Sequence, residues 1–149
     1  MKEKILNKQN PDKMCFVCGT ENGSGLHTDF YELENGELLG ICKLKKEHQS
    51  YPGRGHGGVS AALIDEAVGR AIQINNPDLF GVTIDLNIKY RKPVPLDTEI
   101  KVFSRITKET KRMFEGTAEI VLPNGDIAVT GDAKYIKMPI EKIIDFNNK

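Results

Sequence analysis

The sequence predicts an α+β fold in which an antiparallel sheet of five to six strands wraps around one long buried helix. Three features of the sequence predict it. Apolar and polar residues alternate in several segments, short turn signals separate those segments, and one stretch is apolar around most of a helix surface. Alternation with a period of two is typical of strands. A helix with so little polar surface belongs in the interior, so sheet and helix share one core.

The strand with the clearest pattern spans residues 82–91. One face is apolar and the other polar: Val82, Ile84, Leu86, Ile88 and Tyr90 against Thr83, Asp85, Asn87, Lys89 and Arg91. Further strands are expected around residues 100–106, 113–122 and 127–136, the last two joined by a turn at 123–126 that contains Asn124-Gly125. Asn-Gly favours a type I′ hairpin, because both central residues of that turn need positive φ. A weaker hairpin joins residues 27–33 and 37–44 through a turn at 34–36.

The buried helix is expected over residues 57–74. It should end at Asn75-Asn76-Pro77, because Asn tolerates the left-handed cap and Pro stops a helix. The first dozen residues are polar and predict a loose segment or a short helix. Residues 1–149 are expected to form a single domain, with 1–14 and 140–149 peripheral. One helix covers little of the sheet, so we expect a homodimer or homotetramer.

Composition argues against several classes of partner and location for this protein. Lys plus Arg and Asp plus Glu number 21 each, so no net charge attracts nucleic acid or an anionic membrane. No apolar run approaches the roughly 20 residues that span a bilayer. Residues 1–13 are polar and do not resemble a signal peptide. Three cysteines do not suit a secreted disulfide framework. We therefore expect a cytoplasmic protein without nucleic-acid or membrane partners.

The loop before the helix is rich in glycine. Gly53, Gly55, Gly57 and Gly58 lie within six residues. Glycines of this density suit a backbone that approaches a ligand closely. A helix start also presents unpaired N–H groups at the positive end of the helix dipole. The segment therefore favours binding of an oxygen that gains negative charge.

Asp65 lies two turns into the helix among small and apolar residues. A carboxylate there costs stability unless it is paired or faces a cleft, so Asp65 is a candidate catalytic acid or base. Glu66 faces elsewhere and can pair with Arg70 four residues later.

Residues 55–67 read GHGGVSAALIDEA, which resembles the HGG-x(6)-D signature of hotdog-fold thioesterases of the PaaI-like type. The resemblance extends from about Cys15 to Lys137 and includes Tyr90-Arg91-Lys92-Pro93-Val94 and, more loosely, Cys15-x-x-Cys18-Gly19. It implies the hotdog fold and the hydrolysis of an acyl-CoA or similar thioester. It also implies that no cofactor is needed beyond the CoA moiety of the substrate.

The resemblance further implies roles for single residues. The Gly57 amide polarises the thioester carbonyl, with Gly58 beside the substrate, and Asp65 acts as general base or nucleophile. The two groups that meet one substrate come from different subunits. Thr83 orients water, or is an ordinary solvent-facing strand threonine. Gln49 and Ser50 both lie near the place of a polar amide in some relatives. His56 is a base or, as we favour, an orienting group.

Basic residues cluster near the end of the 82–91 strand. Lys89, Arg91 and Lys92, with Arg54, are candidates to bind the CoA phosphates. Alternatively, they form a charged strand edge that resists aggregation.

Cys15 and Cys18 have metal-ligand spacing. The further candidates, Cys42 and the histidines, form no second ligand pair, so we expect reduced thiols in a buried turn and no metal. Two other functions stay open: a hotdog hydratase or dehydratase, and an acyl-CoA-binding module without turnover. In the hydratase case a catalytic histidine would be expected in another pattern. The sequence does not predict the acyl chain.

Overall fold

The computed structural model describes residues 3–139 and 141–143. Its core element is a seven-stranded antiparallel sheet with the strand order β1-β2-β3-β5-β6-β7-β4. The strands are β1 (Ile5–Lys8), β2 (Asp29–Leu33), β3 (Leu38–Lys43), β4 (Phe80–Tyr90), β5 (Glu99–Glu109), β6 (Met113–Val121) and β7 (Ile127–Met138). The helix α1 (Gly57–Ala71) and the short 3-10 turns η1 (Lys46–His48) and η2 (Ile72–Ile74) complete the fold.

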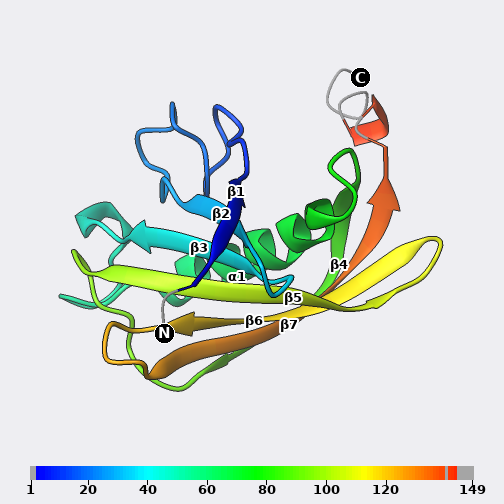
Figure 1. Cartoon of the computed structure of the whole chain (residues 1–149). Coiled ribbons are helices and arrows are strands. Elements are labelled where there is room, and N and C mark those ends of the chain that lie inside the picture. The colour runs from blue at the N-terminus through cyan, green and yellow to red at the C-terminus, as the bar shows by residue number, and fades with distance from the viewer. Residues whose placement is uncertain (1–2, 140, 144–149) are drawn as a thin grey trace.

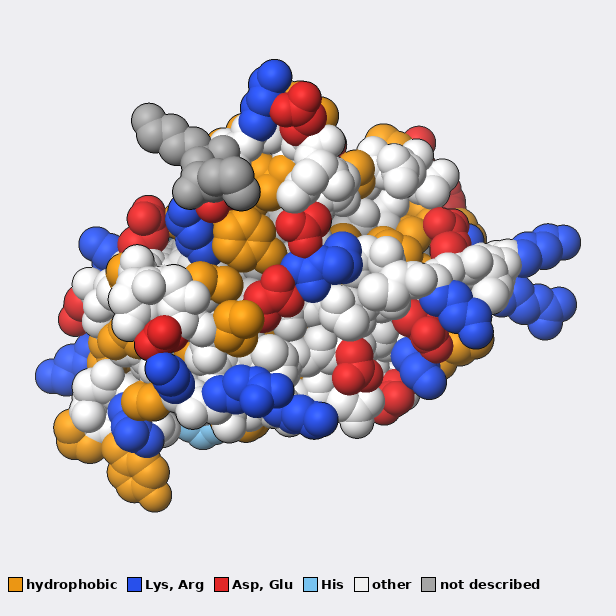
Figure 2. Space-filling view, turned by 60° about the horizontal axis from the view of Figure 1, so that its bottom comes forward, with side chains coloured by type: hydrophobic (Ala, Val, Ile, Leu, Met, Phe, Trp, Pro, Cys, Tyr) orange, Lys and Arg blue, Asp and Glu red, His pale blue; other side chains and the backbone are white. Residues whose placement is uncertain are grey.

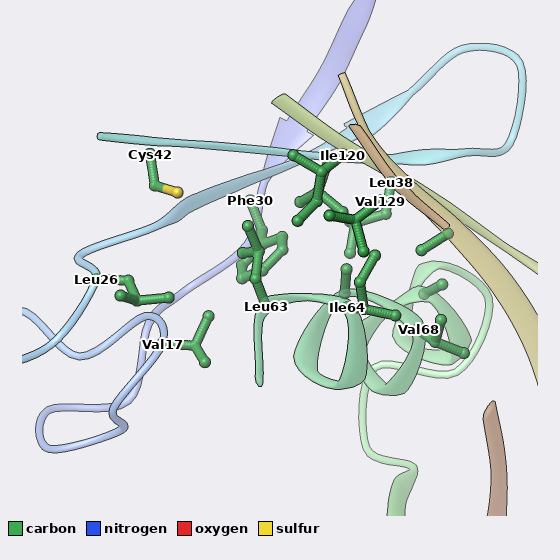
Figure 3. Close-up of a cluster of buried hydrophobic side chains, with 14 of the residues drawn as sticks. Val17, Leu26, Phe30, Leu38, Cys42, Leu63, Ile64, Val68, Ile120 and Val129 are labelled. Carbon is green, nitrogen blue, oxygen red and sulfur yellow. The ribbon is translucent and has the colours of Figure 1, made fainter. Parts of the chain in front are cut away.

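The sheet curves around α1 (Figure 1). Leu63, Ile64 and Val68 are at most 1% exposed and extend from the helix toward the sheet (Figure 3). They meet side chains such as Leu38 and Val129 in one apolar core. The predicted arrangement of one sheet around one buried helix is confirmed, and it places the helix start and Asp65 at the sheet's concave side.

One strand was missed. The loose segment or short helix expected for the first dozen residues is wrong, because β1 pairs with β2, with Ile5 opposite Leu33. The sheet therefore has seven strands rather than five to six. The side chains of β1 are exposed, so the sequence has no alternation there to read. The expected helix 57–74 is divided at Ala71 into α1 and η2. The expected peripheral tail lies mostly outside the described residues.

Both predicted hairpins are present, but their turns are not type I′. In the β6–β7 turn only Gly125 has positive φ, +91°, and in the β2–β3 turn only Gly36, +88°. In each, an Asn side chain accepts a hydrogen bond from the backbone two residues later, Asn124 from Asp126 and Asn35 from Glu37. This is the longer hairpin loop with one left-handed glycine. The acidic residue after each Asn-Gly closes the loop through its carbonyl.

The alternation in β4 is interrupted by a bulge. The register with β7 shifts between Thr83 and Asp85. Leu86 and Ile88 pack against the core, as alternation predicts. The extra residue then turns Thr83 toward the helix as well, whereas strict alternation placed it on the opposite face. Bulges re-aim side chains in this way and often lie next to functional sites.

On the face shown in Figure 2, acidic and basic side chains are interspersed rather than separated. Arg105, for example, lies between Glu37 and Glu119. No helix within residues 3–139 and 141–143 has the length and apolarity to cross a bilayer.

Candidate active site

The carboxylate of Asp65 is held by two hydroxyl groups. Its Oδ1 accepts a hydrogen bond from Thr83 Oγ1 at 2.8 Å and lies 2.9 Å from the Tyr135 hydroxyl. The same hydroxyl lies 2.6 Å from the Asp65 main-chain carbonyl. None of the described residues donates to Oδ2. One carboxylate oxygen is thus fixed by the protein, and the other is open to a reactant.

The β4–β7 register brings the two hydroxyls together, because Thr83 lies opposite Tyr135. The Tyr135 ring stacks on Phe114 at 4.7 Å between centroids. A side chain at Gly81 would come within 2.6 Å of the Phe114 ring, so glycine permits this stack. Burial, and then the negative charge of Asp65, raise the pKa of Tyr135. The phenol therefore keeps its proton and remains a donor.

Asp65 and Thr83 line a cavity of about 510 Å³, together with Tyr135, Glu66 and Arg70. Gln9, just beyond β1, lines it too, and its side-chain Nε2 donates to Glu32 and to the Arg70 carbonyl. The strand that sequence reasoning missed therefore lies close to one wall of the cavity beside Asp65.

At the start of the helix, one backbone amide has no hydrogen-bond acceptor among the described residues. His56 is the N-cap, and its Nδ1 accepts a hydrogen bond from the Gly58 amide at 2.8 Å. The amides of Val59 and Ser60 donate to the His56 carbonyl. The Gly57 amide has no acceptor in the described part of the chain. The Gly57 amide, predicted to polarise the carbonyl, is therefore available, whereas the amide of Gly58 is already bonded to His56. His56 serves as the cap of the helix.

Tyr90 fixes this end of the helix to β4. Its hydroxyl donates to the Gly57 carbonyl at 2.6 Å. A Cβ atom at Gly57 would lie 3.4 Å from the Tyr90 ring, so the contact is close. The sequence placed Tyr90 on the apolar face of a strand and in the segment that carries the family resemblance, without a role for its hydroxyl, and it did not single out Tyr135. A hydroxyl on an otherwise apolar face was the available signal in both cases.

A groove of about 440 Å³, separate from the cavity at Asp65, is lined in part by Gly57. Ser50, Arg54, Tyr90, Arg91 and Lys92 are among its lining residues. Three of the four predicted basic residues therefore meet beside Gly57. Lys92 also pairs with Asp126 at 2.6 Å.

Three predicted substrate-binding residues do not line this groove, namely Gly58, Lys89 and Gln49. Lys89 is exposed on β4. The Gln49 side chain accepts a hydrogen bond from the Gly53 amide at 3.1 Å and so holds the loop. Of the alternatives Gln49 and Ser50, the structure places Ser50 at the groove.

Gly57 and Asp65 do not meet within one chain. They lie eight residues apart on α1, about 12 Å at the helical rise of 1.5 Å per residue. They also line different hollows, the groove and the cavity. A single carbonyl group cannot touch both in one protomer.

The pairing of Glu66 with Arg70 is confirmed, with 2.8 Å between Oε2 and Nε. The structure adds Cys15 and Cys18, whose sulfurs lie 3.3 and 3.5 Å from the same Glu66 oxygen. Sequence reasoning had considered Cys42 and the histidines as companions of this pair. Glu66 is brought there by folding, across about 50 residues of sequence.

Comparison with known proteins matches a sequence model of the thioesterase superfamily to residues 53–129. That range is more than half of the chain and contains the glycine-rich loop, Asp65 and Thr83. The chain belongs to the thioesterase superfamily.

Individual members of the superfamily agree with this assignment. The chain is 30% identical to mouse acyl-coenzyme A thioesterase THEM4 over 129 residues, 85% of this chain and 55% of that protein. It is 30% identical to human acyl-coenzyme A thioesterase 13 over 78 residues, 52% of this chain and 56% of that protein. The chain thus spans about half the length of the curated relatives it matches.

Solved structures of the superfamily share the hotdog fold. The thioesterase superfamily protein RHA08564 is 26% identical, with a TM-score of 0.77 over 83% of this chain and 60% of that chain. A mutant of the phenylacetic acid degradation protein PaaI from Thermus thermophilus is 19% identical, with a TM-score of 0.61 over 69% of this chain and 86% of that chain. The predicted hotdog fold and the predicted membership of the thioesterase superfamily are confirmed.

Proposed function

We propose that this chain hydrolyses an acyl-CoA or a similar acyl thioester to the free acid and the thiol. The proposal rests on the hydrogen bonds of the Asp65 carboxylate. Its Oδ1 accepts from Thr83 and lies within hydrogen-bond distance of Tyr135, while its Oδ2 receives no hydrogen bond from any described residue. Asp65 lines the cavity. Membership of the thioesterase superfamily and the acyl-coenzyme A thioesterase names of its relatives support the proposed reaction.

The proposed unit is a homodimer or a tetramer built from dimers. Because Gly57 and Asp65 of one chain are about 12 Å apart, Gly57 of one protomer would act with Asp65 of another. β4 is a sheet edge, and Val82 and Ile84 on it are 39% and 49% exposed. An exposed apolar edge strand invites pairing with another copy. We infer that this edge brings the two half-sites together.

The chemistry follows from these two groups. The Gly57 amide donates to the thioester carbonyl oxygen and stabilises the negative charge that develops there. Asp65 Oδ2 takes a proton from a water molecule that attacks the carbonyl carbon, or attacks that carbon itself. The tetrahedral intermediate then collapses, the C–S bond breaks, and the thiolate leaves. In the general-base route this step gives the free acid directly. In the nucleophilic route it leaves a mixed anhydride between the acyl group and Asp65, which a water molecule hydrolyses to the free acid and the Asp65 carboxylate. Asp65 is the catalytic residue in both routes, and Thr83 and Tyr135 position it.

The groove beside Gly57 suits the CoA part of the substrate. Arg54 and Arg91 offer guanidinium groups that bind phosphate in a bidentate manner. A BH2602 protein from Bacillus halodurans, 23% identical and with a TM-score of 0.61, was solved with CoA. By analogy we place the CoA phosphates at the Arg54 and Arg91 end, with the acyl group toward the partner's Asp65. The three free thiols fit the expected cytoplasmic location.

The test is release of free CoA from a panel of acyl-CoAs, with Asp65→Asn compared to wild type. We expect the variant to lose on the order of 10²–10⁴ in kcat, the usual contribution of a positioned base. Asp29→Asn, an exposed acid of β2 that pairs with Lys8 and lies away from the β4 edge, is the matched control and should keep wild-type activity. If wild type binds the esters but releases no more CoA than Asp65→Asn, the chain is an acyl-CoA-binding module instead.

A further inference from the structure

The segment that begins at Cys15 forms a tight turn against α1. The Gly19 amide donates to the Cys15 carbonyl at 2.8 Å and closes the turn. A side chain at Gly19 would come within 2.5 Å of that carbonyl oxygen, so the turn requires glycine. The sulfurs of Cys15 and Cys18 and a Glu66 oxygen all lie within 4.8 Å of one another. The two thiols are therefore held side by side by the fold.

The two cysteines differ in environment. Cys18 is 2% exposed, whereas Cys15 is only partly buried. The hydrogen bond with the Cys18 thiol lowers the pKa of Cys15 to about 7, and the same bond raises that of Cys18. A thiolate is the form that attacks disulfides. Cys15 is thus the thiol that solvent can reach, and Cys18 is the buried partner behind it.

Arg70 argues against a metal ion at this cluster. Its Nη2 lies 2.8 Å from the Cys18 sulfur and its Nε 2.8 Å from Glu66 Oε2. A fixed guanidinium already neutralises the site, and a divalent cation there would meet its repulsion. The cluster offers three ligands among the described residues, whereas structural zinc takes four.

We propose that Cys15 and Cys18 form a redox-active dithiol that reacts reversibly with low-molecular-weight disulfides. The Cys15 thiolate attacks one sulfur of the disulfide RSSR, forms a mixed disulfide and releases RS⁻. Cys18 then attacks the Cys15 sulfur, its proton passes to Glu66 Oε2, and a second RS⁻ leaves. In sum, the protein dithiol and RSSR give the protein disulfide and two RSH. The first and fourth residues of a turn lie within about 7 Å of each other, close to the span a disulfide needs.

The experiment counts free thiols in the full chain after treatment with glutathione disulfide. The quenched protein is denatured and alkylated with a maleimide reagent of high mass. Reduced protein should show three alkylated thiols, and oxidised protein one, at Cys42. Dithiothreitol should restore all three. Cys42 is buried, with its pKa raised to about 11 by that burial, so it serves as an internal unreactive thiol.

Single variants separate the roles of the two cysteines. Cys18→Ser should stop at a mixed disulfide with one glutathione on Cys15. Cys15→Ser should react at least about ten-fold more slowly than Cys18→Ser, because Cys18 is buried and protonated. Cys42→Ser should oxidise like wild type. Three free thiols that persist in wild type would overturn the proposal, as would equal reactivity of the two single variants. Stoichiometric binding of Zn²⁺ that protects both thiols would show a metal site instead.

Discussion

At the scale of single residues, the proposed site depends on how the two oxygens of Asp65 are divided. Oδ1 accepts a hydrogen bond from Thr83 and lies 2.9 Å from the Tyr135 hydroxyl, whose one proton is shared with the Asp65 main-chain carbonyl at 2.6 Å. Oδ2 has no donor within the described part of the chain. The Thr83 hydrogen bond and the Tyr135 contact restrict rotation of the carboxylate. Orientation of this kind supplies a large part of general-base catalysis.

Thr83→Val keeps the shape of the side chain and removes its hydroxyl. We expect kcat to fall about 10- to 100-fold with little change in KM, because a hydrogen bond to a charged group is worth about 1.5–3 kcal/mol. Thr83→Ser, which retains the hydroxyl, should recover most of the rate. The measurement is steady-state kinetics on an acyl-CoA that wild type hydrolyses. Equal activity of the valine and serine variants would mean that Thr83 does not position Asp65.

A second prediction concerns Cys42 and pH. Burial raises its pKa from 9.0 to about 11. Below pH 9 the Cys42 thiol is protonated in both the folded and the unfolded chain, so it does not change the free energy of unfolding with pH. Between pH 9 and 11 the unfolded chain loses the proton first, so folding is destabilised, by up to about 2–3 kcal/mol at 1.36 kcal/mol per pKa unit. Urea unfolding of Cys42→Ala should therefore show a shallower loss of stability over this window. Parallel pH curves for the two proteins would contradict the assignment.

Among the helices and strands, the start of α1 contributes most to the proposed site. His56 caps the helix, Tyr90 binds the Gly57 carbonyl, and no described residue accepts from the Gly57 amide. The glycine-rich loop thus supplies a backbone donor that needs no side chain, and β4 fixes its position.

Gly57→Pro removes this one donor. Proline is tolerated at the first helical position, and His56 before it has an extended backbone, ψ 138°, which proline requires of its predecessor. We expect kcat to fall about 10²–10³-fold, as for loss of an oxyanion donor. Gly57→Ala keeps the amide and adds a comparable contact with Tyr90, so it is the matched control. If both variants lose the same activity, crowding rather than the donor explains the effect.

The sequence predicted those elements whose side chains alternate or are apolar throughout. Period-two runs predicted β4 to β7, and α1 was recognised because it has almost no polar surface. The sequence did not predict β1, because backbone hydrogen bonds to β2 hold this strand while its side chains face solvent. A pairing over more than 20 residues leaves no local pattern.

The sequence predicted only the part of the site that local patterns reveal. Asp65, Gly57 and Thr83 could be found from a helix pattern and a motif. Strict alternation placed Thr83 on the wrong face, because a bulge cannot be read from a regular strand. Tyr135 meets Asp65 across 70 residues, and Glu66 meets Cys18 across 48. Such contacts depend on sheet order, which the local sequence does not contain.

At the scale of the whole molecule, the two edges of the sheet are not equivalent. β1 is a short edge of four residues, whereas β4 is an edge of eleven residues with apolar side chains exposed. Ile84 on β4 and Ile5 on β1 are each 49% exposed. The two residues therefore form a matched pair for testing which edge associates.

We expect wild type to have at least twice the 16.6 kDa mass of one chain in solution. Ile84→Lys places a charge in the proposed interface and should shift the protein toward monomers with loss of thioesterase activity. Ile5→Lys should change neither. Light scattering coupled to size exclusion measures the masses. A stable oligomer in Ile84→Lys, or a monomeric wild type with full activity, would exclude β4 as the interface.

If one active site joins Gly57 of one protomer to Asp65 of another, two variants that are each inactive should complement one another. Asp65→Asn and Gly57→Pro are each expected to be nearly inactive alone. When the two are mixed and their subunits exchanged, half of the dimers contain one of each and have one intact site. Activity should then recover to about a quarter of wild type, as expected for a symmetric dimer with two sites. A mixture no more active than the sum of its two parents would mean that Gly57 and Asp65 do not act together across the subunit interface.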